Sequence, residues 1–215
     1  MRDARRLYLI RHGRADYGST DHLRTSRGLV WDPPLDEIGR EQARHLARRL
    51  LSMPPPAALY SSTLRRARET AAAYAELAGA QVVEREDLGE WYGGAWENKS
   101  FEEIFREHPE AKDLFLNQDP AWHLAPGSES AADFQRRVVD VVETILTEHP
   151  EGDIFVVAHG GVINAYLARV LELHDREMFF LPENTSLNTV VVHGDERRAW
   201  FLSDTVHLTD PAWFD

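Results

Sequence analysis

The chain of 215 residues contains no cysteine, and this absence excludes several kinds of chemistry. Disulfide bonds, a thiolate nucleophile and cysteine-ligated zinc or iron–sulfur centres all need a residue that is not there. A chain without cysteine agrees with a reducing compartment, so we expect a cytoplasmic protein.

Long apolar runs are also missing. No segment approaches the ~20 consecutive apolar residues that a membrane-spanning helix needs. The charged start "MRDARR" is followed by a short apolar run that ends at Arg11, which does not fit a secretory signal peptide. We therefore expect a protein without a membrane partner.

Positively charged residues are also fewer than negatively charged ones, and the formal net charge is −12 at pH 7. A nucleic-acid-binding protein usually presents a basic face, so the charge balance argues against that class. The field of the whole protein would also oppose an anionic substrate. Any anion site must then be a local cluster of arginines.

Short apolar runs alternate with segments of helical periodicity along the chain. The predicted strands are 7–10, 57–60, 80–83, 154–158, 189–192 and 199–202, and the predicted helices are 36–51, 63–78, 130–149 and 162–173. This alternation predicts an α/β fold, a three-layer αβα sandwich with a mostly parallel central sheet, in a single domain spanning 1–215. The segment 101–126 contains three prolines and several acids, and we interpret it as a short cap insertion.

Two predicted strands end on a histidine followed by glycine. The first ends in Arg11, His12 and Gly13, and the fourth ends in His159 and Gly160. Ligands of α/β proteins gather at the carboxyl ends of strands, and the start of the following helix offers N–H groups to an anion. A single strand-end histidine is most often a surface residue, but the repeated pattern favours a site.

The segment "SSTLRRARETA" predicts a helix with three arginines close to a strand end. At 100° per residue, Arg65 faces solvent, where Glu69 lies one turn further along. Arg66 and Arg68 flank the apolar stripe, and the periodicity does not choose between them. We favour Arg66 because it lies nearer the helix start.

The segment "LGEWYGGAWENKSFEEI" supplies two candidate general acids, Glu90 and Glu97, although either alone is more often a solvated surface charge. The ten histidines contain no His-x-His or His-x-x-x-His pair, so no metal site is predicted. His45 and His149 lie in polar helical contexts and are expected on the surface.

Six motifs in this order resemble the histidine phosphatase superfamily, the phosphoglycerate-mutase-like proteins. They are "YLIRHG", "PLDEIGREQA", "SSTLRRARETA", "LGEWYGGAWENKSFEEI", "PGSESAADFQRR" and "VVAHGGVI". The resemblance implies that Arg66 binds phosphate, that Glu90 donates the proton and that His159 is the family's second histidine.

On this interpretation neutral His12 attacks phosphorus and becomes a phosphohistidine, and Glu90 protonates the leaving alkoxide before activating water. No metal and no cofactor is expected, because arginines supply the positive charge. The groups expected to hold the phosphate are Arg11, Arg66, His159 and the backbone N–H groups of Gly13 and Gly160.

The chain departs from the family pattern at three places. Arg14 replaces the usual Glu or Gln, Asn98 stands where the family has glycine and suits a left-handed backbone, and the stretch before Glu37 is rich in proline. These departures concern substrate identity more than chemistry. The residues expected at the substrate mouth are Arg14, Tyr17, Arg24, Arg27, Trp91 and Tyr92.

The sequence thus predicts a phosphomonoesterase for a small phosphorylated metabolite. A cofactor-dependent phosphoglycerate mutase is the first alternative, but the cap has only Arg106 and Lys112 as cations. A non-catalytic module that binds a phospho-ligand is the second, and the complete set of five site residues weighs against it. A metal-dependent hydrolase would be inhibited by chelators. A homodimer is left open.

Overall fold

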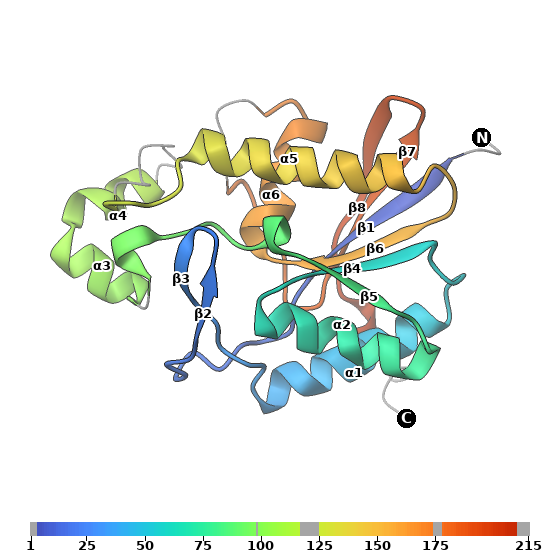
Figure 1. Ribbon diagram of the computed structural model, residues 1–215, viewed down its shortest axis with the longest axis horizontal. Coiled ribbons are helices and arrows are strands. Elements are labelled where there is room, and N and C mark those ends of the chain that lie inside the picture. Colours follow the sequence, from blue (N-terminus) through green and yellow to red (C-terminus); the bar gives the residue numbers. More distant parts are fainter. Residues whose placement is uncertain (1–3, 98, 117–124, 174–177, 210–215) are drawn as a thin grey trace.

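A computed structural model describes residues 4–97, 99–116, 125–173 and 178–209. Its centre is a six-stranded sheet in the order β5-β4-β6-β1-β7-β8 (Figure 1). Neighbours among the first four strands pair in parallel, and β7 and β8 are antiparallel additions. The mostly parallel sheet is confirmed. The strands are β1 (Arg5–Arg11), β4 (Ala58–Ser62), β5 (Val82–Arg85), β6 (Ile154–Ala158), β7 (Leu187–His193) and β8 (Glu196–Asp204).

Helices cover both faces of this sheet, which confirms the three-layer prediction. In Figure 1, α1 and α2 lie below the sheet and α5 and α6 above it. Side chains alternate between the faces of a strand. Leu7 and Leu9 of β1 therefore pack toward α5 and α6, while Tyr8 and Ile10 pack toward α1 and α2. The helices are α1 (Glu37–Leu51), α2 (Arg65–Ala78), α5 (Ala131–Glu148) and α6 (Gly160–Val170).

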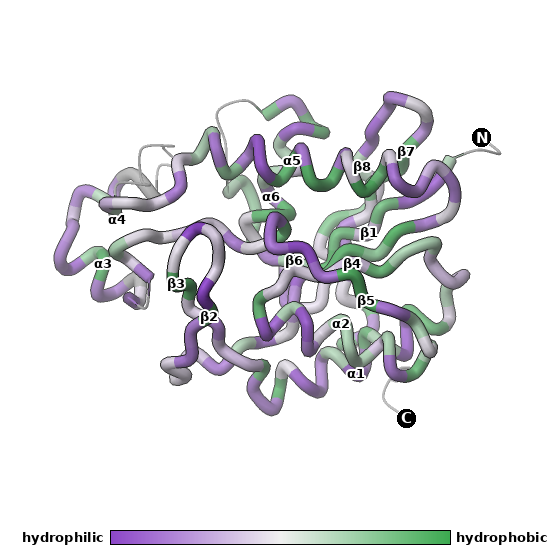
Figure 2. Tube along the Cα trace, in the orientation of Figure 1, coloured by the Kyte–Doolittle hydropathy of each residue, from purple (hydrophilic) through white to green (hydrophobic). Residues whose placement is uncertain are grey.

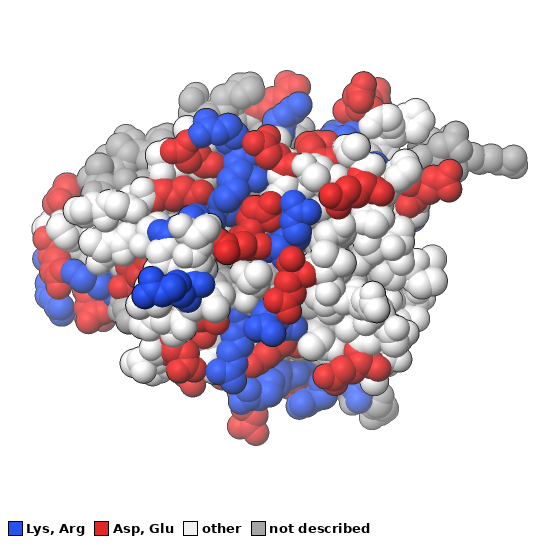
Figure 3. Space-filling model, viewed as in Figure 1, with Lys and Arg blue, Asp and Glu red and all other residues white. Residues whose placement is uncertain are grey.

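The central strand β6 (IFVVA) is apolar along its whole length because both of its faces are covered. Figure 2 shows this as hydrophobic strands inside and helices of mixed colour outside. All five residues of β6 are buried. On the face drawn in Figure 3, Lys and Arg side chains are interspersed with Asp and Glu. Within the described part of the chain, no helix is both long and apolar enough to cross a membrane.

The helix ends follow local chemistry, with two shifts from the prediction. Asp36 caps α1 by accepting from the N–H of Gly39 at 2.7 Å, and Gly79 ends α2 in the left-handed conformation. The helix α2 begins at Arg65 rather than 63, and its N-cap residue, Leu64, makes no side-chain cap. The helix α6 begins two residues earlier than predicted, directly after His159.

A two-stranded hairpin of β2 (His22–Thr25) and β3 (Gly28–Trp31) was not predicted. Each strand has only four residues and β2 is mostly polar, so neither gives a periodic apolar signal. Gly28 has φ of +140°, and a Cβ there would overlap the hydroxyl of Tyr92. The hairpin is thereby seated against the loop that follows β5.

The cap insertion forms helices α3 (Phe101–Glu107) and α4 (Pro109–Leu116), as expected, while residues 117–124 of the predicted cap lie outside the described residues. Ser100 and Glu103 form a capping box at the start of α3. Trp96, Ile104 and Ala111 belong to a small apolar cluster that is separate from the apolar clusters on the two faces of the sheet. In Figure 1 this insertion lies beyond the carboxyl ends of the parallel strands.

His45 is a correction to the sequence prediction, because it is buried and not a surface residue. Its Nε2 lies 3.0 Å from Glu41 Oε1, one helical turn away. A short 3-10 helix at Val206–Leu208 packs against α1, the helix that carries His45, and helps to enclose this side chain. His149 is half-buried, with its Nε2 2.9 Å from the hydroxyl of Tyr60.

Candidate active site

The two histidines at strand ends meet because their strands are neighbours. β1 and β6 run parallel, with Arg11 paired to Ala158. His12 and His159, each one residue further along, therefore lie side by side at the carboxyl edge of the sheet. Their ring centroids are 5.2 Å apart.

The ring of His12 is buried and fixed in one tautomer. Its Nδ1 lies 2.7 Å from the carbonyl oxygen of Gly13. A carbonyl only accepts, so Nδ1 carries the hydrogen and Nε2 keeps the lone pair. Burial, followed by the charges of Arg66 and Arg11, holds the pKa of His12 well below its usual range. His12 is thus a neutral imidazole with an available nucleophilic nitrogen.

Two buried nitrogen atoms of neighbouring described residues have no hydrogen-bond partner. Among the described residues, Nε of Arg11 and Nδ1 of His159 are buried and have no hydrogen-bond partner. The other ring nitrogen of His159 lies 2.9 Å from Ser62 Oγ, and Arg66 is buried with one bond, from Nη1 to the carbonyl of Trp31 at 3.3 Å. Leaving such a buried polar group unpaired costs about 1–3 kcal/mol. An anion with several oxygens, such as phosphate, would pair the Nε–H of Arg11 and the guanidinium of Arg66.

Glu90 faces the same space from the loop after β5. Its carboxylate accepts from the N–H of Trp91 at 2.9 Å and from that of Gly161 at 3.0 Å. A Cβ on Gly161 would lie 2.2 Å from Glu90 Oε1, so only glycine permits this approach. Glu90 is held over the first turn of α6.

Arg11, His12, Arg66 and Glu90 line one cavity of about 370 Å³. Among the described residues of its wall, Arg11 and Arg66 are the only cations, and Glu90 and Glu97 are the only carboxylates. The rest of the wall is mostly apolar or aromatic. It includes Val30, Trp31, Trp91, Phe134, Met178 and Leu181.

Residues 7–205 match the histidine phosphatase superfamily, branch 1. The chain belongs to this superfamily. It is 30% identical over 207 residues to the metal-independent phosphoserine phosphatase of Arabidopsis thaliana, and the aligned region covers 94% of this chain and 83% of the relative. It is 34% identical over 179 residues to glucosyl-3-phosphoglycerate phosphatase of Mycobacterium tuberculosis, covering 79% and 77%. The solved structure of YhfR from Bacillus stearothermophilus superposes with a TM-score of 0.83 at 29% identity, covering 94% and 98%.

The structure brings together all five residues that the sequence analysis proposed for the chemistry. The cavity wall contains Arg11, His12, Arg66 and Glu90, together with Gly160, and His159 lies beside His12. The choice of Arg66 agrees with the structure, since Arg65 pairs with Glu69 and Arg68 with Glu84 on the surface.

Gly13 is a correction to the proposed phosphate-binding set. Its N–H donates to Thr70 Oγ1 at 3.0 Å, so it is already occupied. A Cβ there would lie 2.6 Å from the carbonyl oxygen of Gly39, at the start of α1. The glycine is required for packing of this loop against α1.

The expected mouth is also partly wrong. Tyr17 and Trp91 line the cavity, but Arg14, Arg24, Arg27 and Tyr92 do not. Arg14 pairs with Asp36, Arg24 is exposed on the hairpin, and Tyr92 packs under Gly28. The fourth, Arg27, faces Glu129. Asn98, singled out for a left-handed backbone, lies outside the described residues.

Sequence reasoning missed most of the apolar wall. Val30 and Trp31 come from the unpredicted hairpin, and Met178, Leu181 and Pro182 come from the segment before β7. The run "MFFLP" was a usable signal, because apolar residues there belonged to no predicted element. Glu97 bridges this wall, accepting from the N–H groups of Trp31 at 2.9 Å and Gly93 at 2.8 Å.

We expect the histidines of the site to make folding sensitive to mild acid. Burial, followed by the charge of Arg66, lowers the pKa of both His12 and His159 below the usual 6.5. The unfolded chain therefore binds these protons first, and the free energy of unfolding falls as pH drops below 6.5, by about 1.4 kcal/mol per pH unit for each histidine. His207, whose pKa burial lowers to about 4, adds to the slope.

Urea denaturation at pH 7.5 and pH 5 measures this loss. The double variant His12→Gln, His159→Gln should lose clearly less stability over the same interval. An equal loss in the variant would show that other groups carry the pH dependence.

Proposed function

We propose that the protein is a phosphomonoesterase that hydrolyses a small phosphorylated metabolite through a phosphohistidine on His12. The observation that carries the proposal is the convergence of neutral His12, the unpaired buried Nε–H of Arg11 and the buried Arg66 on one cavity. A phosphoryl group placed there would meet the nucleophile and its counter-charges together.

In the first half-reaction the lone pair on His12 Nε2 forms the N–P bond while the P–O bond to the alcohol breaks. Arg11 and Arg66 stabilise the charge on the phosphoryl oxygens with their planar guanidinium groups. His159 and the N–H of Gly160, which has no partner inside its own helix, complete the phosphate site.

Glu90 supplies the proton in this scheme. The electron pair of the breaking bond passes to the alcohol oxygen, which takes a proton from the carboxyl group of Glu90. In the second half-reaction the Glu90 carboxylate removes a proton from water, the water oxygen bonds to phosphorus and the N–P bond breaks. Neither half-reaction as written uses a metal.

The wall beyond the phosphate site supports hydrolysis over a mutase reaction. A phosphoglycerate mutase must hold a second acidic group, yet the described wall has no cation besides Arg11 and Arg66. Its apolar and aromatic side chains instead suit a leaving alcohol with uncharged or apolar surface. The relatives bear the names of phosphatases acting on phosphoserine and glucosyl-3-phosphoglycerate, one of them described as metal-independent.

Release of inorganic phosphate from a panel of monoesters, with excess EDTA in every reaction, tests this function. We expect turnover of at least one ester, faster release from esters of apolar alcohols than from 3-phosphoglycerate, and no isomerisation of 3-phosphoglycerate in a coupled assay. Chelator-sensitive activity would contradict the metal-free scheme, and efficient isomerisation would favour the mutase. A single domain and a cytoplasmic location stay predictions of the sequence, and a homodimer stays open.

A further inference from the structure

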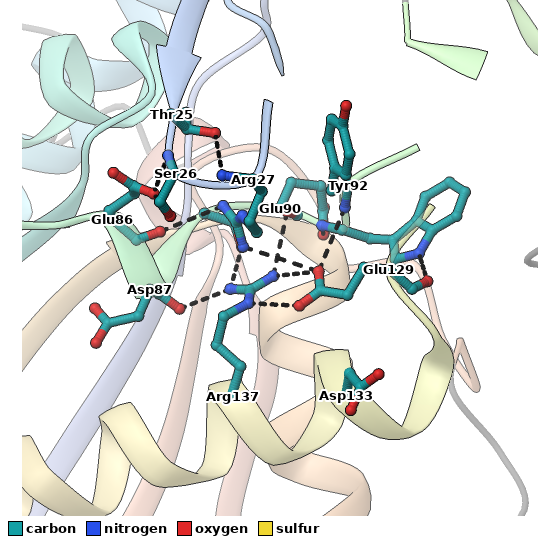
Figure 4. A network of polar contacts seen from close by, with 12 residues as sticks. Thr25, Ser26, Arg27, Glu86, Asp87, Glu90, Tyr92, Glu129, Asp133 and Arg137 are labelled. Carbon is teal, nitrogen blue, oxygen red and sulfur yellow. Dashed lines mark hydrogen bonds and ion pairs between the residues drawn. The ribbon is translucent and has the colours of Figure 1, made fainter. Parts of the chain in front are cut away.

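The side chain of Arg137 extends from α5 to the loop that carries Glu90 (Figure 4). Its Nη1 donates to the carbonyl of Asp87 at 2.7 Å and to that of Gly89 at 2.9 Å. Its Nη2 lies 3.4 Å from the carbonyl of Glu90 itself. One guanidinium group thus contacts three backbone carbonyls of the loop.

The same guanidinium is fixed from its other side by Glu129. Nε and Nη2 of Arg137 each donate to one carboxylate oxygen of Glu129 at 2.7 Å, in a two-point contact. Arg27, in the turn of the β2–β3 hairpin, approaches the same carboxylate at 3.8 Å. All three side chains are largely buried, with 10–17% of their surface exposed. A buried cluster of this kind keeps its charges only in a specific geometry.

Glu129 holds the far side of the loop as well. Its backbone carbonyl accepts from the indole N–H of Trp91 at 2.7 Å, and its N–H donates to the carbonyl of Tyr92 at 2.9 Å. The segment from Asp87 to Tyr92 is therefore fixed on both sides of Glu90. None of Arg27, Glu129 and Arg137 lines the cavity, so none of them is placed to touch a substrate.

We propose that Arg137 is a positioning residue that, together with Glu129, sets where the Glu90 carboxyl group stands relative to the leaving alcohol. This rests on the proposed function, in which Glu90 is the proton donor. The carboxylate reaches Gly161 at the start of α6 only if the backbone of the loop stays where the carbonyl contacts hold it. Small displacements of a catalytic group cost rate steeply.

Lysine at position 137 would keep the positive charge but would not hold the Glu90 loop in place. Its ammonium is a single point and does not span a carboxylate and several carbonyls at once. Arg136 is a matched control, because it precedes Arg137 on the same helix. It is exposed and pairs with Asp133 rather than with the loop.

The leaving group distinguishes positioning of the acid from general damage to the protein. A nitrophenolate departs without a proton, whereas an alkoxide needs one. For Arg137→Lys we expect kcat/KM for an alkyl phosphate to fall by about 10- to 100-fold, a part of the roughly 10²- to 10⁴-fold that general acid catalysis contributes, while nitrophenyl phosphate is little affected. Glu90→Gln should show the same selective loss, and Arg136→Lys should match the wild type on both esters.

Combining the two substitutions tests whether Arg137 acts through Glu90. In the Glu90→Gln background, Arg137→Lys should reduce alkyl-phosphate hydrolysis little further. Should Arg137→Lys fail to fold, Glu129→Gln removes the paired charge at similar volume and should give the same selectivity. Equal loss on both esters overturns the positioning role. If Glu90→Gln itself slows the two esters equally, the proposed role of Glu90 as proton donor is wrong.

Discussion

Replacement of His12 by alanine is expected to abolish turnover of every phosphoester while the fold is kept. In the proposed scheme the lone pair on Nε2 forms the bond to phosphorus, and of the two neighbouring histidines only His12 lines the cavity with Arg11 and Arg66. Loss of a nucleophile costs about 10⁴- to 10⁶-fold in kcat. Steady-state phosphate release, with circular dichroism to confirm folding, measures the effect.

Trapping the intermediate locates the nucleophile independently. A rapid quench without acid, followed by mass spectrometry, should find phosphate on His12 in the wild type and nowhere in His12→Ala. Phosphate on His159 instead would reverse the roles of the two histidines. Substantial hydrolysis by His12→Ala on every ester would sink the assignment altogether.

Arg66→Ala is expected to lower kcat/KM by about 10³-fold or more, the scale seen when an arginine that faces a transferring phosphoryl group is lost. Its guanidinium is buried with only one hydrogen bond, and burial lowers its pKa. A buried cation with so little pairing destabilises the empty protein, so the thermal midpoint should stay the same or rise.

Arg65→Ala is the matched control for this variant. Arg65 is the preceding residue of α2, is about half-exposed and pairs with Glu69 and Asp21 on the surface. It should keep near-wild-type activity and stability. Equal losses in the two variants, measured by kinetics and thermal unfolding, would mean that α2 and not the Arg66 guanidinium is what matters.

The local sequence was sufficient to find the residues that the structure brings together at the carboxyl edge of the sheet. His12 and His159 each follow an unbroken apolar strand, and the carboxyl ends of parallel strands meet at one edge. Helical periodicity separated Arg66 from the solvent-facing Arg65. The same periodicity was uninformative for β2 and β3, because each strand has only four residues and β2 is mostly polar.

The assignment of Glu90 over Glu97 needed more than local pattern. Both carboxylates face the cavity, and the motif resemblance chose between them. The structure adds that Glu97 bridges two backbone N–H groups near the hairpin, whereas Glu90 stands over the start of α6. Which carboxylate is near the phosphate depends on how the loop crosses the helix.

The sequence by itself determined the α/β architecture, the pair of strand-end histidines and the arginine of α2, because each depends on neighbours only a few positions away. Only the tertiary structure decided which groups are free to act. Gly13 is occupied by Thr70, 57 positions away, and Arg14 by Asp36, 22 positions away. Hydrogen-bond partners so distant in sequence leave no local pattern, and the same is true of the walls that shape the substrate.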